Sequence, residues 1–263
     1  MRLVLETKDI PDFDVLTAGF PCQSFSVGGK QKGFNDNRGV LFFEVARVID
    51  TKRPKVIFLE NVENLVEHDK GRTFLVIYNI LAGCGYTVRY KVMPSNEYGD
   101  VPQARKRIYL VAFLEMEQSD GFRFPEPVPL EQTIADIVKR EERQKDIYYY
   151  DKAAPLGGKI YNFIGDSQNL FRVYNGSIRN LRNPRTCPTL TAAMNTPYNA
   201  VVLLDNFGVR RLTLRETLDF QGFRSDYYFP KTVNIKDAYR QVGNSVSVPV
   251  VERIAREILT TFG

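Results

Sequence analysis

The stretch KVIFLEN, residues 55–61, decides the fold. Its apolar core, Val56 to Leu59, lies between Pro54 and the polar pair Glu60–Asn61. A short, nearly continuous apolar run is typical of a strand buried on both faces of a parallel sheet. The run FDVLTAGF, residues 13–20, has the same character. The two runs therefore predict neighbouring buried strands.

Helical and strand patterns alternate around these runs. VLFFEVARVIDTKRP (40–54) and GRTFLVIYNILAGCGY (71–86) have helical spacing, and they end at a proline and at glycines. YTVRYKVM (86–93) and RIYLVAFL (107–114) alternate as strands do. Strands that alternate with helices of this length predict an α/β, doubly wound sheet.

The pattern breaks at FPEPVPLEQT, residues 124–133, where three prolines mark a boundary. Periodicity stays poor to about residue 205, and helical stretches return at 212–223 and 248–262. We therefore expect three segments: an α/β domain over 1–124, a small irregular domain over 125–205, and a return to the first domain over 206–263.

Composition narrows the class of protein. Hydrophobic residues make up 43% and charged residues 25%, which is ordinary for a globular protein with a real core. The three cysteines form no CxxC pair and His68 is the only histidine, so we expect no disulfide framework and no metal. A hydrolase with a histidine base is disfavoured unless His68 is that base. The net charge of +5 fits an anionic partner but does not identify one.

The opening MRLVLETKDIPDFD carries charges throughout and lacks the apolar core of a signal peptide. No apolar run approaches the roughly 18 residues of a membrane span. We therefore expect no membrane association and a cytoplasmic location.

Cys22 and Glu60 follow or end the two short apolar runs. In open α/β sheets, ligands bind at the carboxyl ends of strands, so a thiol and a carboxylate could meet there. Alone, Cys22 could be an ordinary buried cysteine, and Glu60 a solvated or capping glutamate. Their matching positions favour a site.

A further polar cluster is QARKR, residues 103–107, which runs into the strand at 107–114. On an extended chain Arg105 and Arg107 point to one face, where their guanidinium groups could hold an anion or a planar ring. The alternative is a pair of basic residues that protect an edge strand from aggregation.

Five blocks appear in a fixed order: GFPCQSFS, LENV, QARKR, RLTLRETLDFQGF and QVGNSVSVPV. In this order they resemble the blocks of C5-cytosine DNA methyltransferases of bacterial restriction–modification systems. The stretch KQKGFNDNRGVLFFEVARVI, residues 30–49, is also similar to that family. The resemblance covers residues 10–113 and 186–260. It implies a Rossmann-like, S-adenosylmethionine-dependent methyltransferase sheet with a small target-recognition domain.

The resemblance implies a chemical role for Cys22, whose thiolate would add to C6 of cytosine and make C5 nucleophilic. Glu60 would hold or protonate ring N3, and Asn61 would help to orient that edge. Arg105 and Arg107 would contact the cytosine O2 and nearby polar groups, with Gln103 as their support. The cytosine would have to leave the duplex stack to reach Cys22.

The resemblance also implies binding residues for the methyl donor, S-adenosylmethionine, and for double-stranded DNA. The cofactor residues would be Pro21, Leu41, Asn244, Ser245 and Val246. The DNA-binding residues near the vacated base and the phosphates would be Gln23, Ser26, Lys30 and Arg38. In the recognition region, residues 125–200, they would be Arg172, Arg179, Arg182 and Arg185. Without the other blocks, VGNS would be an ordinary turn before a helix, and the segment around Lys30 a plain flexible loop.

The sequence departs from the family in one respect. The glycine-rich strand–loop–helix and the acidic residue that bind the cofactor's methionine and ribose are missing. A split enzyme whose second polypeptide supplies these strands, a truncated gene product and a partial chain are the three explanations. We expect the chain alone to bind S-adenosylmethionine weakly or not at all.

Two alternatives to a DNA methyltransferase stay open at this point. The first is an inactive DNA-binding fragment that keeps the site residues. The second is a tRNA cytosine-5 methyltransferase that uses the same blocks. If DNA is the substrate, the protein would be associated with the nucleoid.

Overall fold

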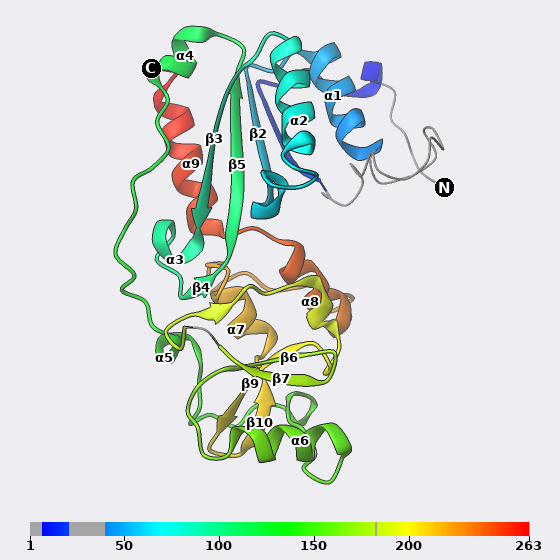
Figure 1. The fold of residues 1–263 in the computed structure, drawn as a ribbon, viewed down its shortest axis with the longest axis vertical. Helices are drawn as coiled ribbons and strands as arrows, with labels where there is room; N and C mark the ends of the chain where they lie inside the picture. Colours follow the sequence, from blue (N-terminus) through cyan, green and yellow to red (C-terminus); the bar gives the residue numbers. More distant parts are fainter. Residues whose placement is uncertain (1–6, 21–39, 182, 263) are drawn as a thin grey trace. The chain divides into compact units, whose positions relative to one another are not determined.

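The computed structural model describes residues 7–20, 40–181 and 183–262. These residues form two compact units. The first unit takes residues 1–93, 106–125 and 254–263, and the second takes residues 94–105 and 126–253. Figure 1 shows the helices and strands of each unit.

The first unit is built on a sheet in the order β1-β2-β5-β3. These strands are β1 (Val15–Gly19), β2 (Val56–Val62), β3 (Thr87–Pro94) and β5 (Lys106–Phe113). β1 pairs with β2 in parallel, as expected, whereas β5 pairs with β2 antiparallel. An apolar run does not indicate the direction of its strand, because a strand buried on both faces has the same apolar pattern in either direction.

The two central strands of this sheet, β2 and β5, are buried on both faces. On one face, α1 (Val40–Lys52) and α2 (Arg72–Gly83) supply Phe42, Ile49, Ile77 and Leu81 to the core. They pack with alternate residues of the strands, namely Ile57, Leu59, Ile108 and Leu110. On the other face the rings of Phe58 and Tyr109 stack with centroids 6.0 Å apart, and Phe113 packs against Phe122. The apolar run at 55–61 therefore corresponds to a strand buried on two sides. The prediction of a buried strand at 13–20 is wrong, because the residues of β1 are exposed or half-buried at this edge of the described sheet.

The second unit contains a different sheet, in the order β10-β9-β6-β7 with antiparallel neighbours. Its strands are β6 (Phe171–Tyr174), β7 (Ser177–Asn180), β9 (Ala200–Asp205) and β10 (Gly208–Arg211). The region 125–205, which the sequence analysis expected to be irregular, thus contributes three of these strands. They are too short for a clear period, but Asn175–Gly176 between β6 and β7 is a strong hairpin signal. Both turn residues have positive φ, 48° and 74°.

Two cores hold this second sheet. One lies against α6 (Pro155–Ile164) and includes Ile160, Ile164, Val173 and Val202. The other includes Val201 and Leu203 of β9 with Phe220 and Tyr239. Tyr239 comes from α8 (Ile235–Asn244), and Phe220 directly follows α7 (Leu214–Asp219).

Residues 206–253 consequently group with residues 126–205, and not with the first unit as the sequence analysis expected. Amphipathic spacing shows that a helix such as α8 has a buried face, but it does not show which core that face joins. The boundary at the prolines, by contrast, coincides with the end of a first-unit segment at residue 125.

Further elements complete the two units. They are η1 (Thr7–Asp9), η2 (Glu63–Leu65), α3 (Ser95–Tyr98), β4 (Gln103–Ala104), α4 (Met116–Gly121), α5 (Ile134–Ile137), η3 (Asp146–Tyr148), β8 (Cys187–Pro188), η4 (Ala192–Asn195) and α9 (Val248–Thr260). Within the ranges that the structure describes, none of the helices has the length and apolar character needed to cross a membrane.

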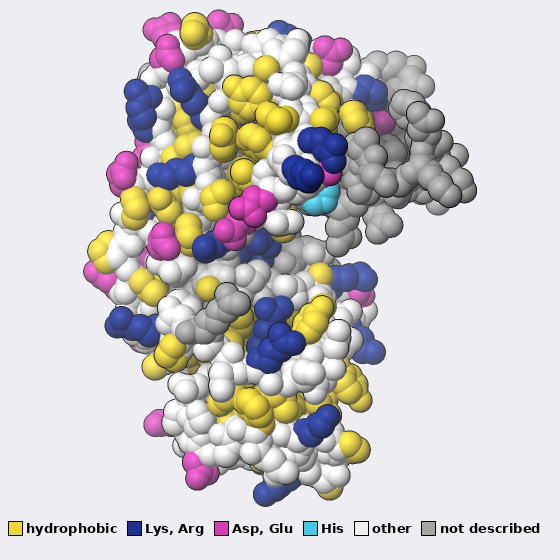
Figure 2. All heavy atoms as spheres, in the orientation of Figure 1, with side chains coloured by type: hydrophobic (Ala, Val, Ile, Leu, Met, Phe, Trp, Pro, Cys, Tyr) yellow, Lys and Arg dark blue, Asp and Glu magenta, His cyan; other side chains and the backbone are white. Residues whose placement is uncertain are grey.

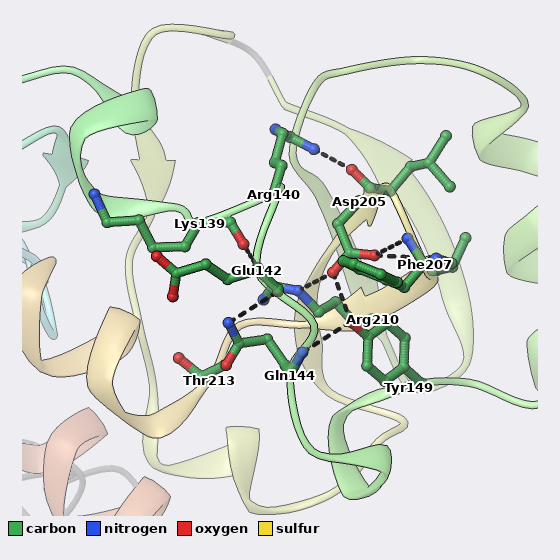
Figure 3. A network of polar contacts seen from close by, with 12 residues as sticks. Lys139, Arg140, Glu142, Gln144, Tyr149, Asp205, Phe207, Arg210 and Thr213 are labelled. Atoms are coloured by element: carbon green, nitrogen blue, oxygen red, sulfur yellow. Dashed lines mark hydrogen bonds and ion pairs between the residues drawn. The ribbon is translucent and has the colours of Figure 1, made fainter.

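A buried charge network ties the second unit together (Figure 3). Arg210 donates to Asp205 at 2.6 Å and to both carboxylate oxygens of Glu216 at 2.8 Å. All three side chains are almost fully buried. Tyr149 donates to Asp205, and the backbone amides of Lys139 and Thr213 donate to Glu216. The network therefore joins β9, β10, the start of α7 and the segment around residues 139–149.

Gly243 lies inside α8, whereas the sequence analysis expected a turn there. The close approach that a glycine allows is nevertheless present, because an added Cβ would overlap the backbone of Thr191 and Ala192. Backbone atoms cannot swing aside as the end of a side chain can. Gly243 is therefore required by the packing of α8 on η4.

We expect Gly243→Ala to destabilise the protein by about 3 kcal/mol, since the added methyl group has no space. Gly83, in the last turn of α2, is the matched control because an added Cβ there meets nothing within 4 Å. Gly83→Ala should be neutral or stabilise by up to about 1 kcal/mol. Urea unfolding of both variants checks this, and equal midpoints would contradict the packing of α8 on η4.

Candidate active site and DNA-facing groove

The catalytic carboxylate expected from the sequence lies on β2 beside β1. Gly19 of β1 pairs with Glu60 of β2 in the parallel register. A Cβ on Gly19 would meet the carboxylate of Glu60 at 3.7 Å. Because Gly19 lies three residues before Cys22, the chain leaves β1 next to this carboxylate. Cys22 itself is outside the described residues.

Glu60 forms an ion pair with Arg107. The Nε atom of Arg107, at the start of β5, lies 2.9 Å from Oε1 of Glu60. The two side chains are only 14% and 19% exposed, so the pair is shielded but not sealed. The antiparallel register of β2 and β5 places Glu60 opposite Tyr109 and Val62 opposite Arg107. The arginine thus reaches back along the strand to hold the carboxylate in place.

Asn61 is buried and fixes the end of β1. Its Nδ2 donates to the backbone carbonyl of Phe20 at 2.7 Å, and its Oδ1 accepts from Val62 N at 2.8 Å. Phe20 is the last described residue before the segment that contains Cys22. Asn61 therefore holds the chain where it leaves β1.

Arg105 and Arg107 do not share one face. Arg107 belongs to the first unit and pairs with Glu60, whereas Arg105 is buried in the second unit. The guanidinium of Arg105 donates to the carbonyls of Leu190 at 3.1 Å, Gly243 and Ser245. The alternation expected from an extended chain fails because Arg105 lies between β4 and β5, outside either strand.

Gln103 is also committed to the second unit. It is fully buried, donates to Phe220 O at 2.7 Å and accepts from Leu190 N at 3.1 Å. The alternative that these basic residues protect an edge strand does not hold for Arg107, because its strand β5 lies between β2 and β3.

The cofactor residues expected from QVGNSV lie at the end of α8. Asn244 is exposed, and Ser245 and Val246 are half-buried. The Ser245 hydroxyl donates to Val242 O at 2.7 Å, and its carbonyl accepts from Arg105. In the first unit, Leu41 on α1 is 39% exposed although it is apolar.

Several expected site residues lie outside the described residues. They are Pro21, Cys22, Gln23, Ser26, Lys30, Arg38 and Arg182. The two remaining cysteines are poor nucleophile candidates. Burial raises the pKa of Cys187 well above its ordinary value, and burial together with nearby Asp50 raises the pKa of Cys84. A thiol with a raised pKa holds little thiolate at neutral pH.

Arg172 and Arg179 lie together on a groove of about 590 Å³ in the second unit. They face each other across the β6–β7 hairpin. The groove is lined by both arginines, Tyr174, Asn180, Asn183 and Thr189, with smaller contributions from their neighbours. Figure 2 shows Lys and Arg side chains gathered over the part of the molecule where β6 and β7 lie in Figure 1. Arg185 is exposed and lines a neighbouring hollow.

Tyr174, Asn180 and Asn183 were not singled out by the sequence analysis. The signal that could have found them is the Asn175–Gly176 turn, which fixes the hairpin register and so sets which residues share a face with Arg172. In the ranges that the structure describes, no group of three or more His, Cys, Asp or Glu side chains could hold a metal ion.

The fold and the polar residues define an α/β enzyme with a shielded carboxylate–arginine pair next to the end of a parallel strand. The family model for C-5 cytosine-specific DNA methylases matches residues 3–260. The chain belongs to the C-5 cytosine-specific DNA methylase family. The family predicted from the sequence blocks is thereby confirmed, and with it the activity of a DNA cytosine-5-methyltransferase.

Similar proteins agree with this assignment. The Type II methyltransferase M.Bsp6I of Bacillus sp. (strain RFL6) is 43% identical over 258 residues, which cover 97% of this chain and 81% of the relative. The Type II methyltransferase M.SsoII of Shigella sonnei is 38% identical over 262 residues, which cover 98% of this chain and 67% of the relative.

The fold is similar to that of the S. pombe Dnmt2 methyltransferase. The TM-score is 0.73 at 23% sequence identity, and the match covers 99% of this chain and 83% of that structure. At this identity the likeness concerns the fold alone, and it confirms the expected α/β fold class.

Proposed function

We propose that this chain is the major catalytic part of a Type II restriction–modification methyltransferase, which methylates C5 of a cytosine in one specific duplex sequence. The Glu60–Arg107 pair carries the proposal. A carboxylate that is largely shielded, held by an arginine and adjacent to the strand that leads to Cys22 is suited to a base edge. The similarity to Type II methyltransferases supports the restriction–modification assignment.

Cys22 is the proposed nucleophile. Its thiolate adds to C6 of the cytosine, and the electron pair of the C5–C6 double bond shifts onto C5. Glu60 donates a hydrogen bond or a proton to N3, so that the negative charge does not build up on the ring. After methylation, the C5 proton leaves to a base, the thiolate is expelled and the aromatic ring is restored.

Arg107 orients Glu60 and is available to contact the cytosine O2 alongside it. Asn61, Gln103 and Arg105 are catalytic candidates from the sequence, and their contacts favour a positioning role. Asn61 holds Phe20, two residues before the nucleophile. Arg105 and Gln103 both bind Leu190, which follows the groove residue Thr189. They link the end of the recognition region to the chain that enters β5.

S-adenosylmethionine is the proposed cofactor and supplies an electrophilic methyl group when it is bound. Leu41 and Pro21 would contact it from the first unit, and Asn244, Ser245 and Val246 from the end of α8. The exposure of Leu41 and Asn244 supports these contacts. The bond from Arg105 to the Ser245 carbonyl fixes the backbone there, so that the amide of Asn244 is held in place.

Duplex DNA is the proposed substrate, and the target cytosine leaves the stack to reach Cys22. Gln23 would lie near the vacated base, and Ser26, Lys30 and Arg38 would contact phosphates. Arg172, Arg179, Arg182 and Arg185 would contact DNA from the recognition region. Because the proposed substrate is DNA, we expect the protein to be cytoplasmic and bound to the nucleoid.

A second polypeptide that supplies further strands remains part of the proposal. Among the described strands, β1 pairs only with β2, and Val15 on β1 is 44% exposed. An edge strand of this kind can accept another strand.

Methyl incorporation tests the proposed function. Cells that express the chain, alone and with a polypeptide carrying the additional strands, are examined by bisulfite sequencing of their DNA. Purified protein is then given labelled S-adenosylmethionine with duplex DNA or tRNA. We expect one methylated duplex sequence and no label in tRNA. Label in tRNA alone would identify an RNA enzyme, and DNA binding without any methylation would identify an inactive DNA-binding protein.

A further inference from the structure

The groove on the β6–β7 hairpin has an unusual charge arrangement. Arg172 and Arg179 are directly opposite each other in the antiparallel ladder, where Cβ atoms lie about 5 Å apart. Like charges in this position destabilise a hairpin. None of the described residues that line the groove is an Asp or Glu that could neutralise them. Two arginines in this position therefore destabilise the free protein. This points to an electronegative partner that offsets their charge.

Five other arginines of the same unit lie beside a carboxylate. Arg143, Arg210, Arg215, Arg224 and Arg240 each pair with a carboxylate at 2.6–2.8 Å. Among the residues that the structure describes, Arg172 and Arg179 form no such ion pair. Unlike those five arginines, Arg172 and Arg179 do not pair their guanidinium groups with a carboxylate of the described chain.

The groove holds Arg172 in a defined position. Its guanidinium lies 5.6 Å from the ring centroid of Tyr174, two residues along the same strand and hence on the same face. Arg172 is half-buried, whereas Arg185 is exposed. A stacked guanidinium loses less freedom when it binds, and its planar fork keeps one direction. Such an arrangement suits a fixed pair of adjacent acceptors, which a base edge or a phosphate can present.

We propose that Arg172 and Arg179 read guanine in the target sequence, by donating to O6 and N7 in the major groove. The inference rests on the proposed function. Every duplex target of a cytosine-5-methyltransferase contains guanine, because the methylated cytosine is paired with one. Guanine presents two adjacent acceptors that match the arginine fork, and a two-stranded ribbon such as β6–β7 fits the major groove. Asn180 and Asn183 on the same groove can donate to and accept from neighbouring base edges.

The test removes one acceptor atom at a time. Once the target is known from the bisulfite map, each of its guanines is replaced in turn by 7-deazaguanine, which lacks N7. Binding of each duplex is measured for the wild-type protein and for Arg172→Ala, Arg179→Ala and Arg185→Ala. At one or two guanines, we expect the analogue to weaken wild-type binding by about tenfold to a hundredfold. At the same guanine, Arg172→Ala or Arg179→Ala should no longer respond to the analogue.

Arg185→Ala is the matched control. This variant should bind all duplexes more weakly and by the same factor. The salt dependence of its binding should fall by the amount of about one phosphate contact, and its binding should still respond to 7-deazaguanine. If Arg172→Ala and Arg179→Ala behave like Arg185→Ala, these arginines bind phosphates and the inference is wrong, although the proposed function survives. A wild-type protein that methylates no sequence overturns the proposed function and this inference together.

Discussion

Glu60→Gln is expected to lower the rate of methyl transfer by about 10²- to 10⁴-fold, the usual contribution of a positioned general acid. Glutamine keeps the shape of the side chain and can still accept a hydrogen bond from Arg107 Nε, now 2.9 Å from the carboxylate. It cannot donate a proton to N3. Binding of duplex DNA and the unfolding midpoint should therefore change little, and the loss should appear in kcat.

Glu63→Gln is the control for this variant. Glu63 follows directly after β2, is 52% exposed and lies 3.7 Å from Lys106, so its charge is largely in solvent. Its removal should leave the rate within about twofold, as expected for an exposed ion pair. Single-turnover methylation of one duplex measures both variants. Equal rates for Glu60→Gln and the wild type would remove Glu60 from the chemistry.

Arg210→Met is expected to destabilise the protein by about 3 to 5 kcal/mol. Methionine fills much of the space but leaves Asp205 and Glu216 buried without their cation. Because Glu216 also accepts from the amides of Thr213 and Lys139, the start of α7 should loosen as well. Urea unfolding gives the free energy directly.

Arg224→Met is the matched control in the same unit. The Arg224–Asp226 pair has the same 2.8 Å separation, but its side chains are 83% and 66% exposed. Its loss should cost less than about 1 kcal/mol. If both variants unfolded at the same urea concentration, the buried network would not be what holds β9, β10 and α7 together.

The strands and helices of the first unit could be predicted from the sequence because each has a strong hydrophobic pattern. The run at 13–20 contains β1, the run at 55–61 covers all of β2 except its last residue, and the amphipathic stretch at 40–54 contains α1. The direction of β5 could not be predicted, since apolar runs do not encode it. In the second unit, the strands of four residues were missed, although Asn175–Gly176 marked the hairpin between them.

The candidate site divides in the same way. Glu60 was singled out because it ends an apolar strand, and Arg107 because it lies in the QARKR cluster. The ion pair between them was not predicted. The burial of Arg105 among backbone carbonyls could not be predicted, because those acceptors come from residues 190, 243 and 245. The pairing of Arg172 with Arg179 likewise depends on a register that composition does not reveal.

A duplex oligonucleotide with 5-fluorocytosine at the target position tests the central claim most directly. Fluorine at C5 cannot leave as a proton does, so the protein should stay covalently bound after methyl transfer. We expect an adduct that survives denaturing electrophoresis and maps to Cys22 by peptide mass spectrometry, and that is lost in Cys22→Ser while duplex binding is kept. An adduct that persists in Cys22→Ser, or that maps to Cys84 or Cys187, would contradict the assignment of Cys22 as the nucleophile.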